Sequence, residues 1–496
     1  MTISSFEFRH IAHSLARVLF CLISALPALS QSLAVSEFHL ENGVKVLLSP
    51  RPGSGAIHAA WFIDGVRGDS GPRQPGSADL MLAAWFSDPN IRDASGFWIM
   101  TSSSGISHGR DILAGGLKNW CDTELSRFTQ IIEPEQVLQG IEFLRAQWEK
   151  PDPMQELLTM ALEGSEHAPP ERRDVNGLSS VSVADIQALA EKYIVPKRIT
   201  IILVGDVDES STNRALETSF GQLPPGAIPL ATIEGNPSKA FFEPPPQERR
   251  QVEIPSRTKT EVLIAWRVPP LQQKLWPTLN LFAEILAGSQ DSRLVRHLVT
   301  DLGFSNEVKV YNSFLAREAG GVFVIQADVA DGHSVHEVES SVQNEIARSF
   351  EEGLEFVEIN RAINSMDVKQ ARRLANASRL AQAMADAIGG SGEWVQAIRQ
   401  ASHGTDLDPG NIKKLLHPIF IDGSTYSLST VRDPILWPRS QDHARLIWLL
   451  KQLQKKRGID GLRGEEAIKE ALRQFGQMPK GKQGEMLSLL ELEAGR

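Results

Sequence analysis

The sequence predicts an α+β protein built from two similar domains. Three observations lead to this fold class. The chain has 496 residues, which is enough for two sizeable domains and a smaller third element. A helix followed closely by a strand is predicted at 181–208 and again at 408–434, which indicates an internal duplication. Sequence rich in proline and glycine separates the two copies, as is typical of a linker.

Composition excludes several classes of protein. Hydrophobic residues make up 42% of the chain and charged residues 23%, which is ordinary for a globular protein. The net charge of −10 argues against nucleic acid as a partner, because that partner requires a basic surface. The two cysteines, Cys21 and Cys121, exclude a disulfide framework and a cysteine zinc site.

The N-terminus predicts a secretory signal peptide over residues 1–30. Basic residues precede the apolar run VLFCLISALPAL, which is too short for a comfortable membrane span of about 20 residues. We expect cleavage after Ser30, with Ala34 as the second choice. An uncleaved membrane anchor is the alternative. The mature protein is then exported, most simply to the periplasm, and has no membrane span.

The first domain is predicted over residues 35–228 and begins with a hairpin. FHLENGVKVLLSP alternates in polarity around Asn42-Gly43, a strong turn signal. A strand follows at 56–63, and then a helix at 76–88, since eight of the ten residues 78–87 are apolar.

The rest of this domain is predicted from similar patterns. The serine- and glycine-rich stretch 88–115 is expected to be irregular, and LSRFTQII at 125–132 to form a strand. The remaining predicted elements are helices at 134–150, 154–164 and 181–194 and a strand at 198–208.

A linker at 229–248 leads to a second domain at 249–434 and a helical tail at 435–496. The elements predicted for the second domain are strands at 249–255, 260–269 and 424–434 and helices at 276–288 and 408–420. Three short helices are predicted in the tail. The first has an apolar face, formed by Leu446, Leu449, Leu450 and Leu453. This helix either folds onto the second domain or forms a docking surface for a partner.

Five segments, in order, resemble the pitrilysin/insulinase-like family of inverzincin metallopeptidases from about Phe38 to Asp433. They are ENGVKVLLSP, GVRGDSGPRQPGSA, GGLKNWCDTELSRFT, VSVADIQALAEKYIVPKRITIILVGDVD and LAGSQDSRLVRHLVTDLGFS. The resemblance implies two domains that face each other like a clamshell. Each would be a mixed or antiparallel sheet with helices packed on one face.

The resemblance places the family's zinc motif, H-x-x-E-H, on the helix at 76–88. In that motif two histidines bind zinc and the glutamate acts as general base. Here the three positions are Asp79, Leu82 and Ala83. Leu82 and Ala83 can neither coordinate a metal nor move a proton, and we interpret Asp79 as a cap of the helix. We therefore expect no catalytic residue, no bound zinc and no other cofactor.

Two further sets of residues offer alternative metal ligands. The family's third ligand comes from a later helix, for which this sequence has little room, and Glu156 or Glu163 would have to replace it. His333, His336 and Glu337 share a helix start with the spacing of metal ligands. An ordinary solvated helix terminus is the alternative there.

The resemblance also implies contacts with a peptide or a partner. Non-catalytic family members place an arginine and a tyrosine, seven residues apart, in the partner's active site. Those positions are His297 and Phe304 here, with Arg293 one turn earlier as a partial substitute. Packing at a helix end is the alternative. Asn119-Trp120 falls where the family has Asn-Ala beside the strand edge that receives peptide.

These expectations converge on a catalytically silent insulinase-like protein. It would be the non-catalytic subunit of an exported zinc metallopeptidase, paired with an active subunit or with itself. One alternative is a stand-alone peptide-binding or chaperone-like module. The other is a peptidase with a rebuilt metal site.

Overall fold

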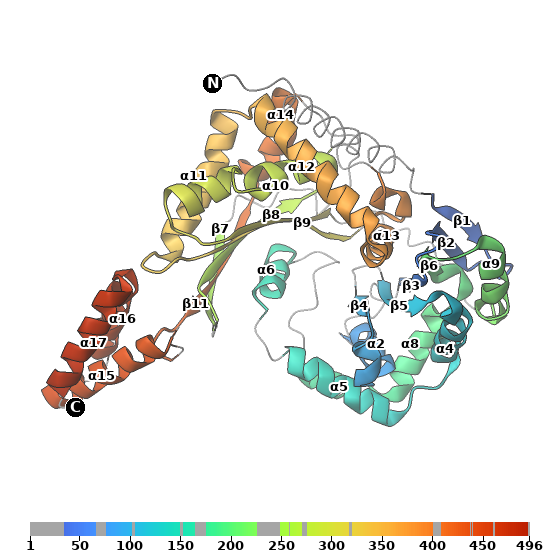
Figure 1. Cartoon of the computed structure of the whole chain (residues 1–496), viewed down its shortest axis with the longest axis horizontal. Helices are drawn as coiled ribbons and strands as arrows, with labels where there is room; N and C mark the ends of the chain where they lie inside the picture. Colours follow the sequence, from blue (N-terminus) through green and yellow to red (C-terminus); the bar gives the residue numbers. More distant parts are fainter. Residues whose placement is uncertain are drawn as a thin grey trace, which may run out of the picture.

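A computed structural model gives the architecture of the chain (Figure 1). The predicted signal peptide, the linker at 229–248 and the loop at 66–75 lie outside the residues that it describes. The described part contains a six-stranded and a five-stranded sheet with helices packed on them, so the α+β prediction is confirmed. The described residues are 34–65, 76–101, 105–148, 152–163, 175–225, 249–256, 258–269, 275–316, 320–399, 408–436, 438, 440–459 and 462–494.

The first sheet has the strand order β1-β2-β6-β3-β5-β4. Strands β2 and β6 run parallel and the other neighbours run antiparallel, so the sheet is mixed. The predicted hairpin is confirmed as β1 and β2, and the side-chain amide of Asn42 at its turn donates to the carbonyl oxygen of Phe220 at 2.8 Å. The strands are β1 (Ser36–His39), β2 (Lys45–Pro50), β3 (Ala56–Asp64), β4 (Trp98–Thr101), β5 (Gly105–Leu113) and β6 (Ile199–Gly205).

Helices from the same half of the chain cover one face of this sheet. Helix α8 illustrates why they form: Ser182 and Asp185 make a capping box at its start, and Ile186, Ala190 and Tyr193 are buried at helical spacing. Their apolar side chains pack with the sheet into one core. The helices of this half, apart from α6, are α2 (Ser77–Trp85), α3 (Pro89–Arg92), α4 (Leu117–Thr129), α5 (Pro134–Trp148), α7 (Val175–Leu178), α8 (Val183–Tyr193) and α9 (Glu209–Glu217).

The second sheet has the order β7-β11-β8-β10-β9, with β7 and β11 parallel. Helices of the second half pack on one of its faces around a second core. Its strands are β7 (Arg249–Ser256), β8 (Glu261–Val268), β9 (Val308–Ala316), β10 (Gly320–Asp328) and β11 (Thr425–Arg432). The helical elements are α10 (Leu275–Ala287), the π-helical η6 (Val295–Asp301), α11 (Val335–Glu351), α12 (Phe356–Ala375) and α14 (Pro409–Phe420).

Each sheet receives on its other face a helix from the opposite half of the chain. Helix α13 (Ala377–Ser391) packs its apolar side chains on Leu47, Ala60, Phe62 and Ile202 of the first sheet. Helix α6 (Pro153–Ala161) packs in the same way on Leu263, Val322, Val324 and Leu428 of the second sheet. The two halves thus close on each other by exchanging one helix each, which completes the predicted clamshell (Figure 1).

Arginines bind carbonyl groups at a helix end beside each exchanged helix, where helix carbonyls lack partners within the helix. Arg267 of β8 donates to the carbonyl oxygens of Ala161 at 2.5 Å and Glu163 at 3.1 Å. Arg51, which follows β2, donates to the carbonyl oxygens of Leu374, at 2.5 Å, and Ala375, at the end of α12 just before α13.

The tail forms three helices, α15 (Gln441–Arg457), α16 (Leu462–Gln477) and α17 (Lys480–Ala494). Buried apolar residues from all three make a core of their own, including Leu446, Ile468, Phe475 and Leu487. Both alternatives for the apolar face of the first tail helix, packing on the second domain and docking of a partner, are therefore wrong. Its apolar face is covered by the other two helices, and the tail extends away from the rest of the molecule (Figure 1).

Two predicted elements are also wrong. The stretch 88–115 is not irregular, since it contains β4 and β5. The predicted strand at 125–132 is the end of helix α4. In the described residues, no helix has both the length and the apolar character needed to span a membrane.

Candidate functional site

The start of helix α2, where the resemblance places the metal motif, is shaped by a glycine. Gly76 precedes the helix with φ of 90°, and a Cβ atom on it would lie 2.6 Å from the Trp148 ring. Gly76 is the N-cap residue and Asp79 lies in the first turn, so the interpretation of Asp79 as the N-cap is wrong. Asp79 instead accepts a hydrogen bond at 2.5 Å from the hydroxyl group of Thr101 on β4. It ties the helix to the edge of the first sheet.

The other two positions of the motif lie in a tightly packed core. Leu82 and Ala83 are each 2% exposed. Helix α5 approaches α2 so closely that a Cβ on Gly140 would lie 2.9 Å from the backbone nitrogen of Ala84 and 3.2 Å from the carbonyl carbon of Ala83. These positions have no donor atoms and little room for larger side chains, so they do not fit a zinc ion.

The face that α5 turns toward α2 is apolar. Its buried residues are Val137, Gly140, Ile141 and Leu144, none of which carries a ligand atom for a metal. Within the described ranges, no group of three histidine, cysteine, aspartate or glutamate side chains is placed to hold a metal ion.

A buried ionic network fixes the C-terminal end of α2. Glu124, which is fully buried on α4, accepts hydrogen bonds from the indole of Trp61 at 3.1 Å and from Arg127 at 3.0 Å. Arg127 also donates to the carbonyl oxygen of Trp85 at the end of α2, and its guanidinium group lies 4.2 Å from the centre of the Phe86 ring. The sequence analysis missed this network, which holds α2 in place through Glu124 Oε2, whereas Glu124 Oε1 has no hydrogen-bond partner among the described residues.

Two reactive residue types near α2 are kept inert by burial. His108 on β5 donates from Nδ1 to the carbonyl oxygen of Trp98 at 2.9 Å, and burial lowers its pKa to about 4. Burial raises the pKa of the Cys121 thiol to about 12, so the thiolate nucleophile does not form near neutral pH. Neither group is suited to proton transfer or nucleophilic attack at pH 7.

A chain of hydrogen bonds holds β4 at the edge of the first sheet. The Trp98 indole donates to His58 Nε2 at 3.1 Å, and His58 Nδ1 donates to Asp111 at 2.7 Å. Ser95 donates to the other carboxylate oxygen of Asp111 at 2.9 Å. Burial lowers the pKa of His58 against the opposing effect of Asp111, which agrees with a neutral ring that accepts from Trp98. These contacts fix the edge strand, and among the described residues no further strand pairs with its outer side.

Asn119 and Trp120 are not beside this edge strand. Both belong to helix α4, where Asn119 is exposed and Trp120 is only 1% exposed. The Trp120 ring packs 5.9 Å from the ring of Phe220, between centres. Trp120 is therefore part of the core in this structure and does not present its ring to a peptide.

The predicted contact residues of the second half have partners of their own. Arg293 is 7% exposed and donates twice to Glu358, at 2.9 and 2.8 Å, and to the carbonyl oxygen of Gly353 at 2.8 Å. His297 is half-buried in η6. Phe304 packs with its ring centre 4.6 Å from that of His333. Arg293 is therefore committed to its own half, whereas His297 remains partly open to solvent.

The alternative metal ligands are also engaged elsewhere. Glu156 and Glu163 belong to the segment that packs on the second sheet, and Glu163 pairs with Arg250 there. Glu337 makes a capping box with Ser334 at the start of α11, which uses its carboxylate as a helix cap. His333 lies 3.9 Å from Glu337, and this group does not assemble as a metal site.

Comparison with known proteins relates part of the chain to a known family. Residues 180–366 match the sequence model described as Peptidase M16 inactive domain. This part of the chain is therefore similar to the M16, or insulinase-like, peptidases. No curated protein matches the chain.

Solved structures share the M16 fold at low sequence identity. A protease from Helicobacter pylori has a TM-score of 0.68 at 15% identity and covers 80% of this chain and 99% of its own. A peptidase M16 inactive domain from Pseudomonas fluorescens has a TM-score of 0.66 at 17% identity, covering 80% and 98%. A chain of complex III2 from Candida albicans, with Inz-5 bound, also has a TM-score of 0.66, at 15% identity, covering 80% and 96%.

Proposed function

We propose that this chain is the non-catalytic subunit of an exported M16 zinc peptidase. It supplies the clamshell fold and a rigid edge strand, while an active partner supplies the metal and the general base. The chain itself binds no catalytic zinc. This proposal joins the match to an inactive M16 domain with the local geometry of α2.

The packing of α2 is the observation that carries the proposal. Zinc hydrolysis needs three protein ligands and an open position for water. The two motif positions that would supply the base and a ligand are buried Leu82 and Ala83, and Gly140 brings a second backbone against them. Asp79 is occupied by its hydrogen bond with Thr101. A helix with these contacts can support a fold but has no means of activating water.

Membership in an assembly is supported by one of the structural relatives. The Candida albicans chain of similar fold comes from complex III2, in which it is one part of a larger assembly. Export is supported by the predicted signal peptide at residues 1–30. A measured N-terminus of the mature protein at or near Gln31, in a periplasmic fraction, would agree with it, and a retained Met1 in the cytoplasm would contradict it.

The edge strand β4 favours a second candidate, a peptide-binding module that works alone. The Trp98–His58–Asp111 chain keeps this strand in place, and an extended peptide can add to such an edge through backbone hydrogen bonds. This candidate needs no active partner.

One purification separates the candidates. The chain is expressed with a tag in its natural host and captured from an exported fraction, and the captured material is assayed for zinc and for chelator-sensitive cleavage of an unstructured peptide. We expect a co-purifying protein with an intact H-x-x-E-H, and activity that is lost when that partner is washed away. A lone chain that binds extended peptide without cleaving it would favour the second candidate. Stoichiometric zinc and cleavage by the isolated chain would overturn both.

A further inference from the structure

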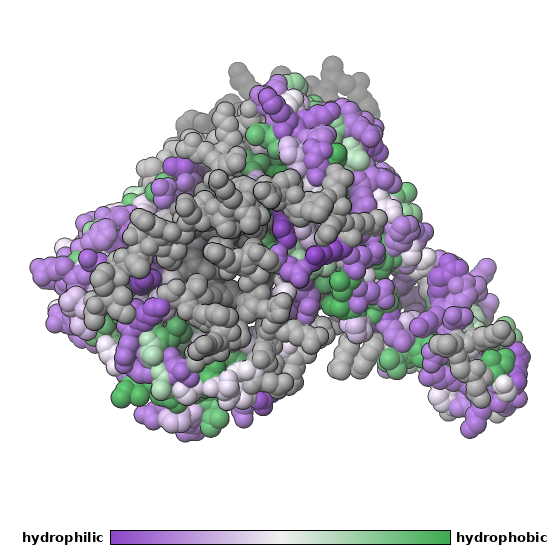
Figure 2. Space-filling model, turned by 180° about the vertical axis from the view of Figure 1, so that it is seen from behind, coloured by the Kyte–Doolittle hydropathy of each residue, from purple (hydrophilic) through white to green (hydrophobic). Residues whose placement is uncertain are grey.

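The tail helices α15–α17 form a lobe with its own core. The similar M16 structures are covered over 96–99% of their own length but cover only 80% of this chain. The tail has its own apolar core, and its helices are joined to one another by ion pairs such as Arg445–Glu491 at 2.5 Å. The view from behind shows it as a separate lobe beside the body (Figure 2).

The tail contacts the rest of the chain at the loop before α11. The Gln477 side chain at the end of α16 lies so close to Gly332 that a Cβ there would be 2.2 Å from its amide nitrogen. Gly476 lies near Asp331 in the same loop, with 3.8 Å between the Asp331 side chain and a Cβ built on Gly476. This contact positions the lobe but leaves most of its surface uncovered.

The charge of the tail is opposite to that of the body. Residues 435–496 contain twelve lysines and arginines and eight acidic residues, a net charge of +4, so the rest of the chain carries −14 of the total of −10. Lys451 and Lys455 on α15 are exposed, and so are Lys480 and Lys482 on α17. A basic lobe on an acidic protein has a favourable electrostatic partner in another copy of that protein.

Apolar side chains accompany these charges. Leu489 and Leu492, one turn apart on α17, are 67% and 73% exposed, whereas Leu487 between the other helices is 3% exposed. Helix α17 thus has one apolar side that faces the tail core and a second that faces solvent. Solvent-facing leucines on a lobe of net positive charge fit a partner surface that is apolar and acidic.

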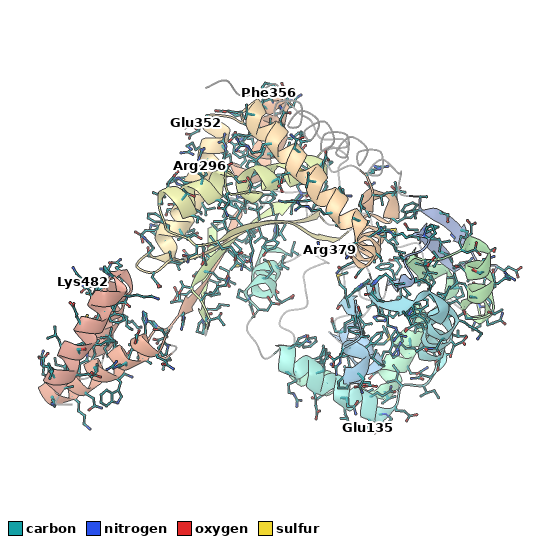
Figure 3. The ribbon with its side chains drawn as sticks, in the orientation of Figure 1. Glu135, Arg296, Glu352, Phe356, Arg379 and Lys482 are labelled. Atoms are coloured by element: carbon teal, nitrogen blue, oxygen red, sulfur yellow. The ribbon has the colours of Figure 1, made fainter. Side chains whose placement is uncertain are left out.

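The body carries a surface of that kind where α11 meets α12. Phe356 and Val357 are 62% and 63% exposed at the start of α12, and Glu351, Glu352 and Glu355 beside them are exposed. We call these five residues the acidic knob. Phe356 and Glu352 lie at the opposite end of the second half from Lys482 of the tail, so a chain cannot place its tail on its own knob (Figure 3).

We propose that the tail docks on the acidic knob of a second copy of this chain. Reciprocal docking, in which each copy gives its tail and receives the other's, closes a two-fold symmetric dimer. Leu489 and Leu492 lie against Phe356 and Val357, and the lysines of the tail face Glu351 and Glu352. Self-association of this kind needs no catalytic partner, so it stands or falls separately from the proposed subunit role.

Reversing the charges on the tail and on the acidic knob tests the proposed docking. The mass of the full chain is measured by light scattering at about 50 µM, above a micromolar Kd, in low and high salt. We expect a dimer that weakens with salt. We also expect about a tenfold or greater loss of affinity in Lys451→Glu/Lys455→Glu and in Glu351→Lys/Glu352→Lys. Combining the two pairs of substitutions in one chain should restore the dimer.

Matched controls keep the result specific. Lys192→Glu/Lys197→Glu makes the same change of net charge on exposed residues of the first half, and it should leave the dimer intact. Leu489→Ser/Leu492→Ser should dissociate it without unfolding the tail, as judged by circular dichroism. A monomeric wild-type chain would overturn the proposal, as would failure of the combined variant to recover. So would binding of the tail lysines to anionic vesicles in place of a second copy.

Discussion

The two exchanged helices, α13 on the first sheet and α6 on the second, each cover one face of a sheet but are held there by different contacts. Helix α13 has 15 residues and presents Leu380, Met384 and Ile388, one turn apart, to the sheet. Helix α6 has nine residues, and arginines of the second sheet bind its C-terminal end. The longer helix relies on apolar area. The shorter one relies more on polar anchors, because it buries less apolar surface.

Truncation of the apolar contacts should have the largest effect. Leu380→Ala is expected to lower the free energy of unfolding by about 2–5 kcal/mol, because Leu380 is fully buried between α13 and the first sheet. Leu157→Ala on α6 should cost a similar amount. Urea denaturation measures both, and hydrogen exchange should rise in β3 and β6 for the first variant and in β8 and β10 for the second.

The control for this pair is Leu138→Ala on α5. Leu138 is 62% exposed, so its truncation should change stability by about 0.5 kcal/mol or less. If Leu380→Ala behaves like this control, α13 does not form the inner cover of the first sheet.

The next largest effect is expected at low pH, which should destabilise the first sheet through His108. Burial lowers the pKa of His108 from 6.5 to about 4, so between these values the unfolded chain binds more protons than the folded one. Stability from this group is complete above pH 6.5 and falls as the pH drops to 4, by about 3 kcal/mol in total. The strands of the second sheet contain no histidine, so this loss belongs to the first half.

The measurement compares wild type with His108→Phe. Urea denaturation at pH 7.5 and at pH 4.5 should show that wild type loses about 2 kcal/mol more than the variant. A difference between the two proteins that does not change with pH would contradict the assignment of this loss to His108.

Removal of a polar anchor should have a moderate effect that differs between the helices. Arg267→Met is expected to cost about 1–3 kcal/mol, because it leaves the carbonyl oxygens of Ala161 and Glu163 without their donor. Arg51→Met should cost less, since α13 keeps its apolar contacts. Hydrogen exchange measured in α6 and in α13 shows separately whether each helix has been loosened from its sheet. Equal costs would remove the proposed difference between the helices.

The smallest effect is expected at the ion pair between Glu163 and Arg250. Both side chains are about half exposed, at 57% and 45%, so solvent screens their attraction. Glu163→Gln should lower the free energy of unfolding by less than about 1 kcal/mol, and 0.5 M salt should largely remove the difference. A larger loss would mean that this pair contributes to the anchoring of α6 as much as Arg267 does.

Periodicity predicted the elements in which apolar residues form a continuous run or recur at regular spacing. The hairpin of β1 and β2, the strands β3, β6, β8 and β11, and the helices α2, α8, α10 and α14 all follow from local pattern. Both errors fall where ionisable residues interrupt the apolar residues. His108 and Arg110 interrupt the apolar pattern of β5, and Glu124 and Arg127 interrupt that of α4. Their burial depends on partners distant in the sequence, which pattern alone does not reveal.

The same limit applies to the candidate site. The residue types at 79, 82 and 83 could be read from the sequence, but the partner of Asp79 could not, because Thr101 lies on a strand that was expected to be irregular. The covering of each sheet by a helix of the other half also escapes local analysis. Helix α13 is visibly amphipathic, yet its sequence does not say which sheet it covers.

The close approach of Gly140 to α2 limits the side chains that can be placed at position 83. A side chain larger than alanine at position 83 would press on the helix that Gly140 brings within contact distance. A metal-binding side chain at this position would require α5 to move, at a loss of stability and before any ligand could give a benefit. Because Gly140 packs α5 against the backbone of α2, each single substitution toward a metal site is unfavourable until several are made together.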